Sequence, residues 1–212
     1  MYLPKHFAEP GVETMHELIS TRPLATLVTL CPGGLEANPI PFHLSSEPQP
    51  YGTLRGHVAR SNPVWKDCVQ DVEALAIFHG PESYITPSWY PTKAETGKAV
   101  PTWNYVTVHA YGALRIIEDA AWLRSHLDAL TLHNEAAFPH PWQLSDAPTD
   151  YLNKLMAEIV GIEIVITRLI GKWKTSQNQP QQNQAGIVHG LRASDHTNAL
   201  QMASLVEKHH VP

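Results

Sequence analysis

Cysteine is scarce in this chain, where 212 residues include only Cys31 and Cys68. The two lie far apart and form no close pair of the kind that binds structural zinc, so a zinc module and a disulfide scaffold are excluded. We expect both thiols to be reduced and packed. Long apolar runs are also lacking, because no window holds about 18 consecutive apolar residues. The first residues do not resemble a secretory signal either, so the sequence predicts a cytoplasmic protein that does not cross a membrane.

Positive charge is in short supply as well. Lys and Arg total 15 against 20 Asp and Glu, which gives a formal net charge of −5 with neutral histidines. A DNA-binding domain is usually recognised by a basic stripe or a known DNA-binding motif, and the sequence has neither. Glycine-rich phosphate loops and the serine elbow of hydrolases are missing too, which excludes the Rossmann, P-loop and α/β-hydrolase classes. The 13 histidines show no metal-ligand spacing, and no metal site is predicted.

Proline, by contrast, is abundant at 18 of 212 residues, well above a typical share of about 5%. So many prolines keep helices and strands short. Strands are expected at 24–30, 35–44, 51–58, 74–78, 83–85, 102–118 and 162–174. Helices are expected at 12–20, from Pro63 to Val69 with Asn62 as the N-cap, after Asp119, after Asp146 and Pro148 up to Gly161, and over 195–208. The pattern is mainly β with peripheral helices (α+β), and it favours a barrel over alternating βαβ units.

Some segments carry a more specific expectation. Pro39 and Pro41 have the same parity in their strand and remove two ladder donors, so this strand is an edge or lines a cleft. Gly112 is expected to bend the long strand that contains it. The segments 90–101 and 177–184 are expected to be mobile loops, the second because five of its eight residues are Gln.

The first candidate site lies where the 51–58 strand meets the following helix. Period-two alternation predicts one polar face made of Thr53, Arg55 and His57. Arg60, the Ser61 hydroxyl and the free N–H groups of a helix opened by Asn62 then converge, and this combination suits a phosphate or another anion. The alternative is an ordinary capped helix with an arginine on its rim.

Aromatic residues supply a second candidate. One face of the long strand is predicted to carry Trp103, Tyr105, Thr107, His109 and Tyr111, and Ser88 and Trp89 precede it in the sequence. Such a stripe suits a planar heteroaromatic ligand, although it could equally be an aromatic layer of the barrel. Further along, Lys172 and Lys174 share a strand face opposite Trp173. This segment is either a solvated strand end or a contact for an anionic or polar ligand edge.

Four long segments resemble the PaiB-type family of FMN-binding negative transcriptional regulators. They are Leu54–Pro63, Tyr84–Tyr90, Val100–Tyr105 and Gly171–Asn178, and the opening residues 1–7 fit as well. The resemblance extends to about Leu191. It implies residues 1–191 as an FMN-binding split β-barrel domain with a helical insertion near 119–160, followed by a C-terminal helix or tail over 192–212. It also implies a homodimer with the flavin at the subunit interface.

The resemblance also implies roles for individual residues. The phosphate of FMN would lie near Arg55, His57, Arg60, Ser61 and Asn62. The ring or ribityl chain would lie near Ser88, Trp89, Trp103, Asn104 and Tyr105. Lys174 and Gln177 would reach the flavin from the partner subunit. The chain departs from the usual family pattern at Thr86, which keeps the hydroxyl of the more common Ser, and in the Gln-rich 177–184 stretch.

Three hypotheses about function follow. The chain is a flavin-binding repressor that acts through a partner or binds DNA through an unusual surface, or it is an FMN-dependent oxidoreductase whose regulatory effects are indirect. The third hypothesis is a flavin-free barrel that binds another planar or anionic ligand. No catalytic residue is predicted, since His57 and His109 are candidates only through their ordinary pKa near neutrality. A flavin would carry any redox step.

Overall fold

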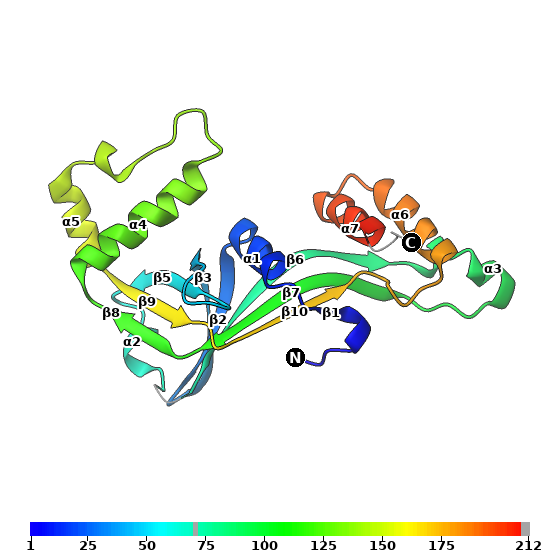
Figure 1. Ribbon diagram of the computed structural model, residues 1–212, viewed down its shortest axis with the longest axis horizontal. Coiled ribbons are helices and arrows are strands. Elements are labelled where there is room, and N and C mark those ends of the chain that lie inside the picture. The colour runs from blue at the N-terminus through cyan, green and yellow to red at the C-terminus, as the bar shows by residue number, and fades with distance from the viewer. Residues whose placement is uncertain (70–71, 209–212) are drawn as a thin grey trace. The chain divides into compact units, whose positions relative to one another are not determined.

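Two antiparallel sheets organise the part of the chain that our computed structural model describes, residues 1–69 and 72–208 (Figure 1). The larger sheet has the order β1 (Ala8–Glu9), β10 (Arg168–Lys174), β7 (Thr102–Gly112), β6 (Ala74–Ile85), β2 (Leu24–Cys31) and β3 (Gly34–Pro41). The smaller sheet has the order β4 (His43–Ser45), β5 (Thr53–Ala59), β9 (Ile159–Val165) and β8 (Leu114–Ile117).

Helices are interspersed among these strands. They are α1 (Val12–Thr21), α2 (Val64–Asp67), α3 (Thr92–Thr96), α4 (Ala120–Glu135), α5 (Thr149–Ala157), α6 (Gln181–Arg192) and α7 (Thr197–Lys208). Three short 3-10 turns are η1 (Lys5–Phe7), η2 (Pro87–Trp89) and η3 (Leu144–Asp146). Among the described helices, none combines the length and the apolar character that a bilayer crossing requires. The last four residues of the predicted tail, 209–212, lie outside the described residues.

The chain divides into two compact units. The terminal unit contains Met1–Gly11, His79–Val108 and the residues from Ile170 onward, and the central unit contains Val12–Phe78 and His109–Leu169. Strands β6, β7 and β10 contribute residues to both units. Each unit is described by itself below.

The central unit contains the predicted hairpin of β2 and β3. Its strands pair from Leu24 opposite Pro41 to Cys31 opposite Gly34, and Gly34 adopts the left-handed φ of 117° that the turn requires. β3 is the last strand of its sheet, so the edge position predicted from the two prolines is confirmed. Both cysteines are free and buried, as predicted.

Local signals also positioned the polar face and the helix start correctly. In β5, Leu54, Gly56 and Val58 are buried while Arg55 and His57 are half-buried, as the predicted alternation requires. Thr53, the third residue of the predicted polar face, is buried and donates to the Glu47 carbonyl at 2.8 Å. The carboxylate of Asp119 accepts a hydrogen bond from the Trp122 N–H at 2.6 Å and thereby caps α4. The long strand predicted over 102–118 ends as β7 at Gly112, where the bend was expected, and continues as β8.

Three predictions about β6 and the terminal unit are corrected by the structure. The 74–78 and 83–85 strands form one strand, β6, and the expected loop at 90–101 contains the short helix α3. The Gln-rich segment is no loop beyond Pro180, because α6 begins at Gln181. Composition was misleading there, since Ile187 and Leu191 on the same helix are fully buried and the Gln184 amide donates to the Gln179 carbonyl at 2.7 Å. Apolar burial one turn further along outweighs the polar character of the helix start.

Helices α6 and α7 pack against each other in Figure 1 and form the core of the terminal unit. The buried cluster joins them to the end of β6 and to η2 and comprises Ile85, Tyr90, Ile187, Leu191, Ala199, Met202, Ala203 and Val206. The helix predicted over 195–208 is therefore confirmed as α7, and the unpredicted α6 is its packing partner. These two helices cover one face of the strands that carry the aromatic residues discussed next.

Candidate functional site

One face of β7 carries exposed aromatic rings in the terminal unit. Trp103 is 54% exposed, whereas the next residue, Asn104, is almost completely buried on the opposite face. Trp103 meets Tyr84 of β6 edge to face, with ring centroids 5.9 Å apart. Large exposed aromatic rings in edge-to-face contact provide a surface on which a planar ligand can stack. Of the predicted stripe, Trp103 and Tyr105 belong to the terminal unit, whereas Thr107 is buried and His109 and Tyr111 belong to the central unit.

Two lysines extend the aromatic face onto β10. The ammonium of Lys172 lies 5.1 Å from the centre of the Tyr105 ring, and that of Lys174 lies 5.9 Å from it. Lys174 donates to the Thr102 hydroxyl at 2.6 Å and also to the Trp103 carbonyl. Burial, followed by the nearby charge of Lys172, lowers the pKa of Lys174. We call Tyr84, Trp103, Tyr105, Lys172 and Lys174 the aromatic–lysine face.

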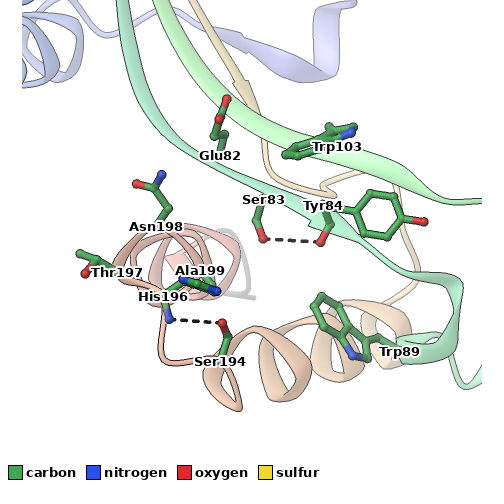
Figure 2. A pocket seen from close by; sticks show the side chains of 10 residues that line it. All are labelled: Glu82, Ser83, Tyr84, Trp89, Trp103, Ser194, His196, Thr197, Asn198 and Ala199. Atoms are coloured by element: carbon green, nitrogen blue, oxygen red, sulfur yellow. Dashed lines mark hydrogen bonds between the residues drawn. The ribbon is translucent and has the colours of Figure 1, made fainter.

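A cavity of about 620 Å³ opens beside this face (Figure 2). Its lining comes from the end of β6, from η2, from β7 and from the start of α7, and comprises Glu82, Ser83, Tyr84, Trp89, Trp103, Ser194, His196, Thr197, Asn198 and Ala199. The volume falls in the range of about 300–1,000 Å³ typical of small-molecule sites. Two of the predicted ring contacts, Trp89 and Trp103, are thus brought to one cavity.

The close approach of Trp89 to α6 shapes this cavity. A Cβ added to Gly190 would lie 2.2 Å from the indole, and one added to Gly186 would lie 2.0 Å from the Trp89 carbonyl oxygen. Only glycine at these two positions, one helical turn apart, lets η2 approach the helix so closely. Ser88 lies on the same turn, where its N–H donates to the Thr86 hydroxyl at 3.3 Å.

A smaller cavity of about 180 Å³ has a polar lining. Its residues are Tyr90, Val100, Thr102, Asn104, Lys174, Ser176, Asn178 and Gln179. The Asn104 amide donates to the Ser176 hydroxyl at 2.9 Å, and Ser176 has a left-handed φ of 65°. The Tyr90 hydroxyl is buried without a hydrogen-bond partner among the described residues, and burial raises its pKa. An unsatisfied buried hydroxyl beside a polar cavity is a ready donor or acceptor for a ligand.

The side chain of Gln177 forms hydrogen bonds to backbone groups of the protein. Its side-chain oxygen accepts from the Thr175 N–H at 2.8 Å and its amide donates to the Trp173 carbonyl at 2.6 Å. The side chain therefore closes the turn at the end of β10.

The predicted phosphate residues lie in the central unit, and the side chains of Arg55, His57, Arg60 and Asn62 contact protein groups there. Arg60 pairs with the Glu118 carboxylate at 2.8 Å and donates to the carbonyls of Ala157 and Ile159 at 2.9 and 3.3 Å. The Asn62 side-chain oxygen accepts from the Val64 N–H at 3.0 Å, at the start of the four-residue helix α2. The N-cap position of α2 is Pro63, one residue later than the Asn62 cap that the sequence predicted, and it makes no side-chain capping bond. Ser61 lies between Arg60 and Asn62 in the same turn and is exposed.

Arg55 and His57 likewise face protein groups. Arg55 pairs with Glu163 at 3.2 Å, and Arg115 pairs with the same buried carboxylate at 2.9 Å. His57 Nδ1 lies 3.1 Å from Nε2 of His126, whose ring stacks on Trp122 with centroids 5.2 Å apart. Burial, with His57 as the next cause, lowers the pKa of His126 to about 3.

The structure therefore sorts the twelve predicted site residues into two groups. The terminal unit holds Ser88, Trp89, Trp103, Asn104, Tyr105, Lys174 and Gln177, and the central unit holds Arg55, His57, Arg60, Ser61 and Asn62. Sequence reasoning missed the contribution of Glu82 and of the α7 start to the larger cavity. The pair Gly186 and Gly190, one helical turn apart, was a sequence signal only for the close approach of Trp89 to α6.

Comparison with known proteins gives the family. Residues 1–168 match the family described as "Putative FMN-binding domain". The chain belongs to this FMN-binding family. It is 36% identical over 226 residues to the uncharacterized protein AN0679 of Emericella nidulans, covering 90% of each chain. It is 29% identical over 207 residues to the protease synthase and sporulation protein PAI 2 of Bacillus subtilis, covering 98% of this chain and 97% of the relative.

A solved structure supports the fold. The FAD and heme binding protein from Mycobacterium smegmatis superposes with a TM-score of 0.59 at 20% identity, over 79% of this chain and 73% of that chain. A likeness at this identity concerns the fold. The antiparallel sheets with peripheral helices are those of the predicted α+β split-barrel class, and the resemblance predicted from the sequence is confirmed.

FMN, the predicted cofactor, is the cofactor of this family. The residues present fit such a group, since the terminal unit combines exposed aromatic rings, a polar cavity with an unsatisfied Tyr90 hydroxyl and two lysine ammonium groups. When bound, FMN supplies one- or two-electron redox chemistry, while the protein binds and orients it.

Proposed function

We propose that this FMN-binding chain is a homodimeric regulator of the PAI 2 type that represses transcription. The match to PAI 2 carries the proposal, because it spans 98% of this chain and 97% of that protein. A relative matched from end to end has little additional chain in which a separate regulatory domain could lie. The regulatory surface would then belong to the flavin-binding fold itself.

We further propose that the flavin ring binds on the terminal unit. The exposed rings of Trp103 and Tyr84, and the cavity that they share with Trp89, support this proposal. Ser88, Asn104, Tyr105 and Gln177 would shape the surrounding pocket walls. In the central unit, Arg55, His57, Arg60 and Asn62 would maintain the β5 strand and the turn after it, since these side chains contact protein groups. Ser61 belongs to the same turn.

Flavin titration of tryptophan variants tests the ring site. Quenching of FMN fluorescence gives the dissociation constant for the unmodified chain, Trp103→Ala and Trp142→Ala. Loss of the stacking surface at Trp103 should weaken FMN binding by about tenfold. Trp142 is also partly exposed but lies in the central unit, so it serves as a matched control. Equal weakening in both variants would contradict a ring site at Trp103.

Gel shifts test the regulatory part. The chain has a net charge of −5, so direct DNA binding requires a local positive surface and should weaken steeply as salt rises. Purified protein with and without FMN is mixed with promoter fragments at low salt and with non-specific competitor. A specific, salt-sensitive shift supports direct repression. No shift at any salt, together with intact FMN binding, favours action through a partner protein or an FMN-dependent oxidoreductase.

A further inference from the structure

The smaller cavity of the terminal unit is lined by a tyrosine whose buried hydroxyl is not satisfied by the protein. Tyr90 lines this cavity of about 180 Å³ and is only 6% exposed. Its hydroxyl has no hydrogen-bond partner among the described residues. The ring packs in the core cluster of α6 and α7, which fixes the position of the hydroxyl. A buried polar group without a partner costs free energy, and a bound molecule would remove that cost.

Lys174 brings a positive charge to the same cavity. It is the one charged side chain among the described lining residues. Its ammonium has three N–H donors, of which two go to the Thr102 hydroxyl at 2.6 Å and to the Trp103 carbonyl, so one remains. The ion pairs in the described part of the chain give Lys174 no carboxylate. Burial lowers the pKa of Lys174, with Lys172 as the second cause. A bound anion would offset that burial.

Other polar groups of the lining add to this donor character. The Thr102 hydroxyl accepts from Lys174, so its own O–H is left for another acceptor. Asn104 and Ser176 bond to each other, at 2.9 Å from amide to hydroxyl and at 3.1 Å from hydroxyl to amide oxygen, and form a fixed wall. Neither Asp nor Glu is among the described residues of the lining. These groups together favour a ligand that accepts hydrogen bonds and carries a negative charge.

The size of the cavity restricts the ligand to a small molecule. Its volume of about 180 Å³ corresponds to about six water molecules at about 30 Å³ each, and it lies below the range of about 300–1,000 Å³ typical of sites for larger ligands. A three-ring flavin does not fit such a volume. None of the described lining residues is shared with the larger cavity, where we place the flavin ring. Val100 supplies an apolar contact for a short alkyl chain.

We propose that this cavity binds a short-chain monocarboxylate of about two to four carbon atoms, a size set by the volume. Its carboxylate would accept hydrogen bonds from the Lys174 ammonium and the Tyr90 hydroxyl. A carboxylate is an acceptor with two oxygens, and hydrogen bonds to a charged group are the strong ones. One ammonium matches one negative charge. The site goes beyond the proposed function and does not depend on flavin binding.

Thermal unfolding and calorimetric titration with sodium acetate, propionate and butyrate test the site. A ligand that binds only the folded chain raises the Tm. Acetamide is the neutral analogue of acetate, and sodium sulfate at equal ionic strength reports non-specific anion binding. Tyr90→Phe removes the hydroxyl alone, and Lys174→Gln removes the charge. Tyr84→Phe and Lys93→Gln are the matched controls, because they change a tyrosine and a lysine of the same unit outside this lining.

We expect the carboxylates to bind the unmodified chain, and acetamide and sulfate to bind about tenfold or more weakly. Tyr90→Phe and Lys174→Gln should each weaken carboxylate binding by about tenfold or more, since each removes a hydrogen bond to a charged group. Both control variants should bind the carboxylates as the unmodified chain does. Without ligand, Tyr90→Phe should not lower the Tm, because an unsatisfied hydroxyl does not stabilise the fold. A purely structural role of the hydroxyl would lower it.

Equal binding of acetate and acetamide would overturn the proposal, and so would equal weakening in Tyr84→Phe and Tyr90→Phe. If neither method detects carboxylate binding, the cavity holds water alone and the proposal is wrong. FMN titration in saturating acetate keeps this proposal apart from the proposed function. An unchanged FMN affinity supports two separate sites, and competition between acetate and FMN overturns the carboxylate site. A chain that binds acetate and not FMN contradicts the proposed function and supports this site.

Discussion

At the scale of single residues, Arg60 joins three separate parts of the central unit. Its guanidinium bonds to the end of α5 at Ala157, to the start of β9 at Ile159 and to Glu118 after β8. These contacts link residues 58 to 99 positions apart in the sequence. A side chain with this many protein partners stabilises the fold more directly than it binds a ligand.

Arg60→Ala should therefore reduce stability. We expect the free energy of unfolding, measured by urea denaturation, to fall by about 1–3 kcal/mol, because charge-assisted hydrogen bonds to two carbonyls and a carboxylate are lost. Arg124→Ala is a suitable control, since Arg124 makes only a surface pair with Asp128 at 3.5 Å, worth about 0.5 kcal/mol or less. Equal stability losses in the two variants would contradict this role for Arg60.

At the scale of elements, the contact between α6 and η2 depends on two glycines. Gly190→Ala would force a methyl group into the Trp89 indole, at distances of 2.2 to 2.5 Å from three ring atoms. We expect a loss of about 1–3 kcal/mol in unfolding free energy from overpacking, with a changed tryptophan emission spectrum. Gly33→Ala, where an added Cβ has no neighbour within 4 Å, should leave both quantities nearly unchanged.

A double-mutant cycle makes this prediction specific to Trp89. If the clash is with the indole, Trp89→Ala should remove most of the additional cost of Gly190→Ala, because the methyl group then has room. Additive losses in the double variant would indicate that the glycine is needed for another reason, such as the backbone of the helix.

The packing of α4 in the central unit should depend on pH. His126 on α4 is 2% exposed and faces His57 of β5, and burial lowers the pKa of both histidines. His43 and Arg55 also lower the pKa of His126, to about 3. In the unfolded chain His126 takes up a proton near pH 6.5, whereas in the folded chain it takes up that proton only near pH 3. Stability is complete above the unfolded pKa and falls as the pH drops through this window.

Urea midpoints from pH 7 to pH 4 measure this effect. A difference of one bound proton between the unfolded and the folded chain changes the unfolding free energy by about 1.4 kcal/mol per pH unit. His126→Phe keeps a ring against Trp122 and removes the titrating group, so its pH profile should be flatter than that of the unmodified chain. His140→Gln changes an exposed histidine and should leave the slope unaltered. Parallel profiles for all three proteins would exclude His126 as the cause.

At the scale of the whole molecule, we expect a homodimer of about twice the 23.6 kDa chain mass. Trp103 and Tyr84 are large, exposed and clustered, and aromatic residues of this kind are enriched at protein interfaces. Sedimentation velocity gives the mass of the unmodified chain, and Trp103→Glu should shift it toward the monomer. A monomer that binds FMN with full affinity would contradict the dimeric part of the proposed function.

Features that depend on near neighbours along the chain could be predicted without the structure. Turn residues predicted the β2–β3 hairpin, and two prolines predicted the edge position of β3. Period-two alternation predicted the faces of β5 and β7, and Asp119 predicted the cap of α4. Each of these is set by interactions within a few residues along the chain. The family and its cofactor were also evident from four long motifs.

Side-chain partners that are distant in the sequence became known only from the folded chain. Glu118 with Arg60, His126 with His57 and Tyr2 with Lys172 are pairs separated by 58 to 170 residues, and no local pattern identifies such partners. The same reason explains the missed helix α6, whose Gln-rich start is ordered by apolar burial of Ile187 and Leu191 against other segments. Contacts between residues that are far apart in the sequence determine which charged side chains have a partner of opposite charge. They left Arg60 paired and Lys172 without a carboxylate among the described residues.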